Sequence, residues 1–494
     1  SRCDSLEQVA RAVHLPCFSL QQLSYADLAR RAWLNFWMAL PARSALRNER
    51  LASLFGAIAA APLQKEPDVD WAALCEGSGK LPIPFIGALE VRQLPGRGLG
   101  LLAARPIQAG ELLLLENAWA TSRTAGASSQ QAMLELVQAC SKKAHNADTL
   151  EQAAFWSLHG RGQEDAGPAR LASFQQYLNS LRGLPAGAAK LHRGDADWIN
   201  SIVAANSRRS ETWNAHTLLL DETQALGGLW LVASLFNHSC LANVTISYGV
   251  HKDGGGVVLV ARAASDINQD EELVDTYVYP FETVLERRSR LQHTYGFSCG
   301  CRRCTVEAPL ASEAGELADS LESALQRFSS LRGRGGKPGE MATVVQTIRS
   351  VLESVDAAAM RLSPEPRLLW RAQFVWGHHG LAMAAQEAEM FQEAVEAFRS
   401  CIDLAAIIAP SSEYELKYHM MLTQCMSRQI FSSPPHVAKD MAASLKEALR
   451  RAEEVHNRHY GGGGHHFLRR MQKRLENVYA ALRYCSKTRA HTAK

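Results

Sequence analysis

Three cysteines fall within six residues of this 494-residue chain, at Cys299, Cys301 and Cys304. A disulfide inside a Cys-x-Cys pair would be strained, because two cysteines so close along the chain do not reach the geometry of a relaxed bridge. Thiolates at this spacing are typical ligands of zinc, which takes four ligands in a closed tetrahedral site when its role is structural. The cluster therefore predicts a segment organised by a metal, with a fourth ligand from elsewhere in the chain.

Composition describes a globular protein of two to four domains, with 47% hydrophobic and 21% charged residues. Lysine and arginine number 53 against 50 aspartate and glutamate, so we do not expect direct binding to nucleic acid. No apolar run approaches the roughly 20 residues of a membrane span.

Most of the other cysteines are scattered, which is unlike the paired framework of a secreted protein. Together with the absence of a signal-peptide pattern in the first residues, this predicts an intracellular protein, cytoplasmic or nuclear. The scattered cysteines are Cys3, Cys17, Cys75, Cys140, Cys401, Cys425 and Cys485.

Hydrophobic spacing predicts an α+β chain that alternates between helical and strand-rich regions. Helical spacing dominates the first 80 or so residues, and apolar residues then alternate from Gly87 onward. Helical spacing returns over residues 128–182, a strand-rich stretch follows from about Ala204 to Tyr279, and everything beyond Cys304 is helical.

Three further motifs carry groups that could serve chemistry. The stretch Gly96-Arg97-Gly98-Leu99-Gly100 allows close approach of backbone to a ligand. An Asn237-His238-Ser239-Cys240 turn follows an apolar run, and its amide can both donate and accept hydrogen bonds. Tyr277 lies just beyond the acidic pair in Asp270-Glu271-Glu272-Leu273.

In order and spacing, these motifs and the cysteine cluster resemble the SMYD-type branch of the SET-domain protein lysine methyltransferases. The resemblance implies a SET β-fold with a zinc-bound post-SET segment and methyl transfer from S-adenosylmethionine to a lysine of a protein substrate. It also implies a helix over Gly228–Ser234, leading into the Asn237 turn. The domains expected are an N-terminal helical region (1–85), the SET domain (86–280) with a helical insert at about 126–200, the post-SET segment (281–310) and a helical C-terminal domain (311–494).

The resemblance also assigns residues. It makes Tyr277 the catalytic tyrosine, which orients the amine. By sequence alone, Tyr279 is a competing candidate for this role. Tyr295 and Phe297 would wall the lysine channel, and Cys240 would be the fourth zinc ligand beside Cys299, Cys301 and Cys304. The cofactor would contact Arg97, Gly98, Leu99, Gly100, Asn206, Asn237, His238, Tyr277 and Phe297.

The chain departs from the family pattern at several positions. Leu99 stands where a polar contact to the cofactor is common, Ala242 where proline is usual, and Asp270 where glycine is common. Residues 120–230 contain the single cysteine Cys140, so the MYND zinc finger of SMYD proteins and the contacts credited to it are not carried over.

The C-terminal helices admit two interpretations. The spacing Ala388-x-x-Phe391-x-x-Ala394-x-x-x-Phe398 resembles half of a tetratricopeptide (TPR) unit, and ordinary helical hairpins fit almost as well. Their family counterparts form one wall of the substrate cleft. A rival from another functional class is a catalytically weak SET protein that binds partners through its helical domains. The substrate, the number of methyl groups added and the oligomeric state are not determined by the sequence.

Overall fold

The computed structural model describes residues 67, 69–75, 81–146, 149–160, 168–185, 195–210, 212–214, 217–221, 223, 225–250 and 256–491. The chain divides into two compact units, Ser1–Lys65 and Glu66–Lys494, and all described residues belong to the second. Most of the predicted N-terminal helical region lies outside the described residues, apart from the short helix α4 (Trp71–Cys75) and its neighbours.

Short strands build the half of the unit that contains the motifs, in two four-stranded sheets with the orders β1-β4-β12-β11 and β10-β13-β3-β2. Smaller pairings join β5, β9 and β6, and β7 with β8. The strands are β1 (Phe85–Ile86), β2 (Leu89–Leu94), β3 (Gly98–Ala103), β4 (Leu112–Asn117), β5 (Ala120–Thr121), β6 (Arg208–Arg209), β7 (Thr212–Asn214), β8 (Leu219–Asp221), β9 (Gly227–Leu229), β10 (Asn237–His238), β11 (Val244–Val250), β12 (Val257–Ala263) and β13 (Glu272–Asp275).

The central strands read as apolar runs because both of their faces are covered. All seven residues of β12 are buried, as are residues 112–116 of β4. Among the described residues between β5 and β6, four helices occupy the place of the predicted insert: α5 (Ser129–Asn146), α6 (Thr149–Trp156), α7 (Pro168–Leu181) and α8 (Ala196–Asn206). The last of them ends at Asn206, which puts this residue at a helix terminus beside β6.

The helix predicted over Gly228–Ser234 is wrong. The structure has strand β9 followed by a single 3-10 turn at Ala233–Leu235. A Cβ atom at Gly228 would lie 2.4 Å from the Trp230 ring, so the backbone there is packed against a side chain two residues ahead. The amides of Val232 and Ala233 donate to the buried carboxylate of Glu116 rather than to a preceding helical turn.

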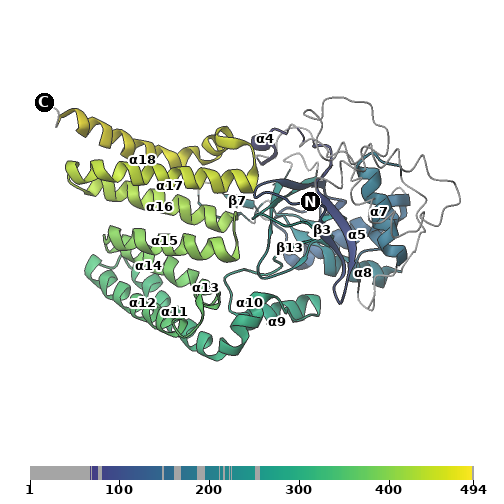
Figure 1. The fold of residues 1–494 in the computed structure, drawn as a ribbon, viewed down its shortest axis with the longest axis horizontal. Helices are drawn as coiled ribbons and strands as arrows, with labels where there is room; N and C mark the ends of the chain where they lie inside the picture. Colours follow the sequence, from purple (N-terminus) through teal and green to yellow (C-terminus); the bar gives the residue numbers. More distant parts are fainter. Residues whose placement is uncertain are drawn as a thin grey trace, which may run out of the picture. The chain divides into compact units, whose positions relative to one another are not determined.

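Beyond the strands the chain is helical, which confirms the α+β class and the helical C-terminal region (Figure 1). Each long helix packs against its neighbours along the chain. Helical hairpins and TPR units both show this packing, so the TPR assignment stays a prediction. The helices are α9 (Val284–Tyr295), α10 (Arg302–Glu307), α11 (Ala311–Gly333), α12 (Pro338–Ala359), α13 (Pro364–Ala372), α14 (Val375–Glu387), α15 (Phe391–Ile408), α16 (Glu413–Ser432), α17 (Pro435–Tyr460) and α18 (Gly463–His491).

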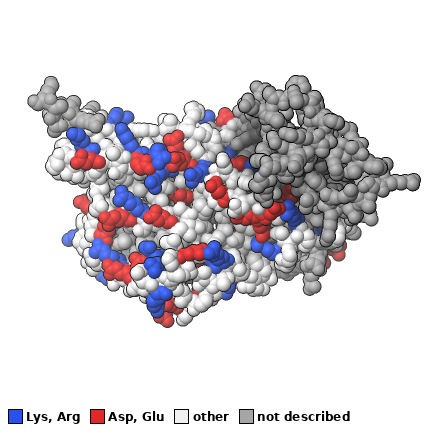
Figure 2. Space-filling model, in the orientation of Figure 1, with Lys and Arg blue, Asp and Glu red and all other residues white. Residues whose placement is uncertain are grey.

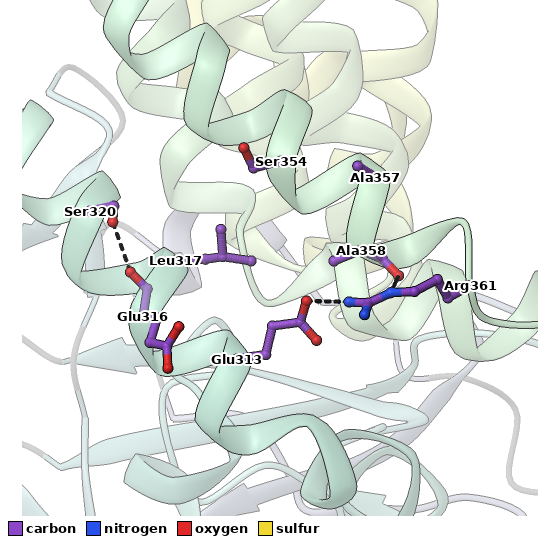
Figure 3. Close-up of a pocket in the computed structure, with 8 residues that line it drawn as sticks. All are labelled: Glu313, Glu316, Leu317, Ser320, Ser354, Ala357, Ala358 and Arg361. Atoms are coloured by element: carbon purple, nitrogen blue, oxygen red, sulfur yellow. Dashed lines mark hydrogen bonds and ion pairs between the residues drawn. The ribbon is translucent and has the colours of Figure 1, made fainter.

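A hollow of about 510 Å³ lies between α11 and the end of α12. Two of its polar contacts are internal to the protein: Glu313 pairs with Arg361, and the Ser320 hydroxyl donates to the Glu316 carbonyl (Figure 3). The hollow lies within the helical domain and shares no lining residue with the cavities described below.

Acidic and basic side chains are intermixed over the C-terminal helices on the face drawn in Figure 2. Within the described ranges, none of the helices combines the length and the apolar character that crossing a membrane requires.

The turn between α17 and α18 fixes the helical domain to the sheet. Gly461 adopts a φ of 74°, and a Cβ atom there would lie 2.4 Å from Nη2 of Arg262. The Arg262 side chain cannot move freely, since Nη1 donates to the Gly110 carbonyl at 2.9 Å and the guanidinium lies 4.5 Å from the Trp71 ring centroid. A second tie joins the Thr245 hydroxyl of β11 to Nδ1 of His459 at 2.6 Å.

We therefore predict that Gly461→Ala lowers the free energy of unfolding by about 1 kcal/mol more than Gly463→Ala. Both glycines have a positive φ, but a Cβ at Gly463 meets open space. Urea denaturation of the two variants beside the wild type measures the difference. Equal losses would mean that the close packing on Arg262 does not matter.

Candidate active site

The site is organised by a parallel pairing between β10 (Asn237–His238) and β13 (Glu272–Asp275). This pairing brings Tyr277, just beyond β13, against the residues around β10. The Tyr277 hydroxyl donates to the Phe236 carbonyl at 2.6 Å, and its backbone N–H donates to Nδ1 of His238 at 3.0 Å. Two motifs some 40 positions apart thus form one unit.

Tyr277 is enclosed by aromatic and charged groups. Its ring centroid lies 4.9 Å from that of Tyr295 and 5.3 Å from that of His238, and the Arg208 guanidinium lies 5.5 Å from it. Burial raises the pKa of the phenol, against a smaller opposing effect of Arg208. The hydroxyl is therefore a neutral hydrogen-bond donor over the ordinary pH range.

The glycine stretch supplies backbone to the same place. Gly96 and Gly98 have φ values of 65° and 72°, which only glycine adopts readily, and Leu99 offers its carbonyl to Nδ2 of Asn237 at 3.2 Å. Gly100 leaves no room for a Cβ, which would lie 2.8 Å from that same Nδ2. The amide of Asn237 is thus held against the backbone of Leu99 and Gly100, at a place where Gly100 has no room for a side chain.

Arg97 ties the glycine stretch to β10 and β13. Its Nη2 donates to the His238 carbonyl at 2.7 Å, and its Nη1 pairs with Glu272 at 2.9 Å. Glu272 also accepts from Nδ2 of Asn237 at 3.0 Å. Glu272 is therefore a common partner of Arg97 and Asn237.

A cavity of about 620 Å³ opens where these elements meet. Of the predicted cofactor residues, all but Gly100 line it: Arg97, Gly98, Leu99, Asn206, Asn237, His238, Tyr277 and Phe297. Gly100 lies behind Asn237. Nδ2 of Asn206 donates to the carbonyls of His159 and Ile202, which leaves its side-chain oxygen as the group able to accept from a ligand.

A smaller cavity of about 290 Å³ adjoins the first. The two cavities share Ala205, Asn206, Ser234, Tyr277 and Tyr295. Tyr277 is therefore one of the residues at the boundary, or neck, between the two chambers. Its neighbour in sequence, Tyr279, lines neither cavity; it is 42% exposed and packs against Phe281 and Tyr414.

Four cysteine sulfurs gather beside the larger cavity. Sγ atoms of Cys240, Cys299, Cys301 and Cys304 all lie within 4.8 Å of one another and could hold a metal ion. Hydrogen bonding to Cys240, foremost among its causes, lowers the pKa of Cys301 to about 6. On binding a shared divalent cation, the cysteines would release their protons to solvent and act as thiolate ligands.

Arg287 of α9 closes the other side of this cluster. The side chain is fully buried, donates to Sγ of Cys240 at 3.3 Å, and pairs with Glu307 at 2.5 Å. Arg303 reaches the same carboxylate at 2.7 Å. Arg287 thus supports the thiol cluster from within the protein.

Several residues of the site were not found from the sequence. Ser157, His159 and Arg170 line the larger cavity from the helical insert, more than 50 positions from the glycine stretch and from the Asn237 turn, and no local pattern marks them. Arg208 lines the smaller cavity and pairs with Asp275 at 2.5 Å. Its place two residues after Asn206 is the one signal that could have drawn attention to it.

Known proteins are similar to this chain in the same region. The SET domain family matches residues 98–278. A methyltransferase of Gibberella zeae is 24% identical over 323 residues, 60% of this chain and 41% of the fungal protein. The N-lysine methyltransferase SMYD2 of Rattus norvegicus is 27% identical over 273 residues, 45% of this chain and 61% of the rat protein. The histone-lysine N-methyltransferase SET5 of Scheffersomyces stipitis is 32% identical over 106 residues, 19% of this chain and 22% of the yeast protein.

This chain therefore spans less than two thirds of the length of these relatives. These matches confirm the resemblance to SMYD-type SET-domain lysine methyltransferases that the motifs predict.

The packing at Gly100 yields a test of the larger cavity. Gly100→Ala should push the Asn237 amide out of place and weaken binding of S-adenosylmethionine by about tenfold, the equivalent of one hydrogen bond of ordinary strength. Calorimetry measures the affinity. Gly300→Ala is the matched control, because Gly300 also lines the cavity but a Cβ there meets nothing within 4 Å. Equal affinities for both variants would remove Asn237 from the binding site.

Proposed function

Because residues 98–278 form a SET domain and the chain is a relative of SMYD-type lysine methyltransferases, we propose that it transfers a methyl group from S-adenosylmethionine to the side-chain amine of a lysine in a protein substrate. The observation that carries the proposal is the position of Tyr277 at the neck between two chambers, with its hydroxyl on the Phe236 carbonyl. In this proposal the larger chamber takes the methyl donor and the smaller one takes the lysine.

The donor would be held by polar groups already fixed in place. Asn206 and Asn237 line the larger chamber, and Arg97 and Arg170 line it with positive charge that suits the carboxylate of the donor. Leu99 contributes backbone alone, so its apolar side chain does not prevent this mode of binding.

When bound, the donor supplies an electrophilic methyl group on a sulfonium. The neutral lysine amine attacks the methyl carbon, the carbon–sulfur bond breaks, and the methylated nitrogen then releases a proton to solvent. The protein has no bond of its own to make, so its contribution is alignment and desolvation. Tyr277 and Tyr295 would wall the approach, and Phe297 would stack at the donor end.

We further propose that the four thiols bind one structural zinc ion. The donor set suits zinc, since four cysteine ligands leave no open position for water. The ion would hold residues 299–304 against β10 and so fix Tyr295 and Phe297, which immediately precede the cluster.

A protein partner presenting a lysine is the expected substrate, and the domain boundaries at 85/86, 280/281 and 310/311 remain part of the proposal. An intracellular location, cytoplasmic or nuclear, fits the reduced thiols. The rival function, a scaffold with weak catalysis, would use the same helical domain for binding but would not need an aligned hydroxyl at the neck.

Replacement of Tyr277 by phenylalanine tests the catalytic role. We predict that Tyr277→Phe lowers turnover by about 100-fold or more, because alignment of the amine is lost, while affinity for S-adenosylmethionine stays within about threefold. The measurement is transfer of labelled methyl groups to core histones and lysate proteins. Tyr279→Phe, two residues away and outside both cavities, should keep its turnover. Full activity in Tyr277→Phe would refute the assignment.

Metal content tests the thiol site. The purified protein should contain about one zinc ion per chain, and Cys301→Ser should lose most of it, since one of four ligands is removed. Elemental analysis by mass spectrometry gives the ratio. Cys425→Ser, a buried cysteine of α16, serves as the control that keeps its zinc. An undiminished zinc content in Cys301→Ser would show that the ligand set is wrong.

A further inference from the structure

The smaller cavity has an unusual charge for a chamber that receives an amine. Two arginines line it, Arg208 and Arg209, and no aspartate or glutamate occurs among the described residues that form its wall. A lysine side chain arrives from water as a cation, so these walls repel the form in which it is carried. A role in binding the ammonium would call for a carboxylate at the wall.

The Arg208 side chain is fixed by a buried partner. Its Nη1 lies 2.5 Å from Oδ2 of Asp275, and the two side chains are 16% and 11% exposed. Asp275 belongs to β13 and does not line the cavity, whereas Arg208 does. The positive end of the ion pair therefore faces the chamber and the negative end lies behind it.

The guanidinium also lies close to the neck. It is 5.5 Å from the ring centroid of Tyr277, one of the residues that both cavities share. A second acidic group that acts on Arg208 is Glu116, whose buried carboxylate accepts hydrogen bonds from the backbone amides of Val232 and Ala233. Among the described residues, the titratable and charged groups that line the chamber are Arg208 and Arg209 from β6, Tyr248 from β11, Tyr277 after β13 and Tyr295 from α9.

Building on the proposed function, we infer that Arg208, held by Asp275, tunes the acceptor chamber to take the lysine as a neutral amine and to exclude the ammonium. The physical reason is that a positive charge facing the amine disfavours the protonated state, and low exposure keeps the interaction from being screened by solvent. The proton then leaves to solvent before the amine reaches the neck, and the lone pair is available for attack. Arg208 acts here on the protonation of the substrate and forms no bond to it.

The two partners of the ion pair should have opposite effects. Arg208→Gln removes the cation that faces the chamber, so the pKa of the bound amine should rise. The acidic limb of the pH–rate profile should therefore shift to higher pH by about one unit. Asp275→Asn removes the anion behind Arg208, so the acidic limb should shift to lower pH. Arg208→Lys keeps the charge and should keep the position of the limb, whatever its rate.

Methyl transfer to core histones, measured from pH 6 to 10 in the wild type and the three variants, gives these profiles. A purely structural role would change rates without moving the limb, or would move it in the same direction in Arg208→Gln and Asp275→Asn. Either result would overturn the inference. Thermal melting and calorimetric binding of S-adenosylhomocysteine confirm that each variant is folded.

A second measurement does not depend on a protein substrate. With S-adenosylhomocysteine bound, n-butylamine can serve as a stand-in for the lysine side chain, and its binding can be followed by NMR titration. At pH 7, where this amine is a cation, Arg208→Gln should bind it about tenfold more tightly than the wild type, and Asp275→Asn more weakly. The neutral alcohol n-pentanol, of similar size, should bind all variants alike.

Equal binding of n-butylamine by the wild type and Arg208→Gln, or no measurable binding by Arg208→Gln, would contradict the inference. The two claims can fail separately. Methyl transfer without discrimination against the cation would leave the proposed function intact and remove the role of Arg208. Discrimination against the cation without any methyl transfer would leave the role of Arg208 intact and remove the proposed function.

Discussion

The pairing of two residues of β10 with two of β13 is the contact on which the site depends. On one side of this pairing the Phe236 carbonyl meets the Tyr277 hydroxyl, and on the other Cys240 enters the thiol cluster. His238 links both sides, since its Nδ1 accepts from the Tyr277 amide and its Nε2 lies 3.4 Å from Sγ of Cys240. A parallel pairing this short is weak by itself, so the thiol cluster and the glycine stretch that flank it must hold it in register.

Buried charge supplies much of that support. Glu307 accepts from both Arg287 and Arg303, and the side chains of all three are fully buried. Removing one partner from such a group leaves charge without compensation, which typically costs about 3–5 kcal/mol. Because Arg287 also contacts the sulfur of Cys240, the stability of α9 and α10 is coupled to the state of the cysteines. The helical domain is joined to the sheet separately, through the α17–α18 turn on Arg262.

The sequence predicted those parts of the site whose chemistry is local. The cysteine spacing, the Asn-His-Ser-Cys turn and Tyr277 each identify themselves by residue type, and the resemblance brought Cys240 to the other three. The departure at Asp270 has a physical explanation, since its φ of 63° is a conformation that glycine adopts freely and aspartate tolerates better than most residues. What the sequence missed depends on packing between distant elements. Arg170 reaches the cavity from the insert, and the predicted helix over Gly228–Ser234 gave way to the fit of Trp230 on Gly228.

The central claim is that the two chambers meeting at Tyr277 serve transfer of a methyl group to lysine. The most direct test is to incubate the full chain with S-adenosylmethionine carrying a deuterated methyl group and a cell lysate, and to locate the label on proteins by tandem mass spectrometry. The account predicts deuterated methyl groups on the side-chain nitrogen of lysine. Label on another type of residue, or none on any protein when the donor is bound with normal affinity, would contradict it.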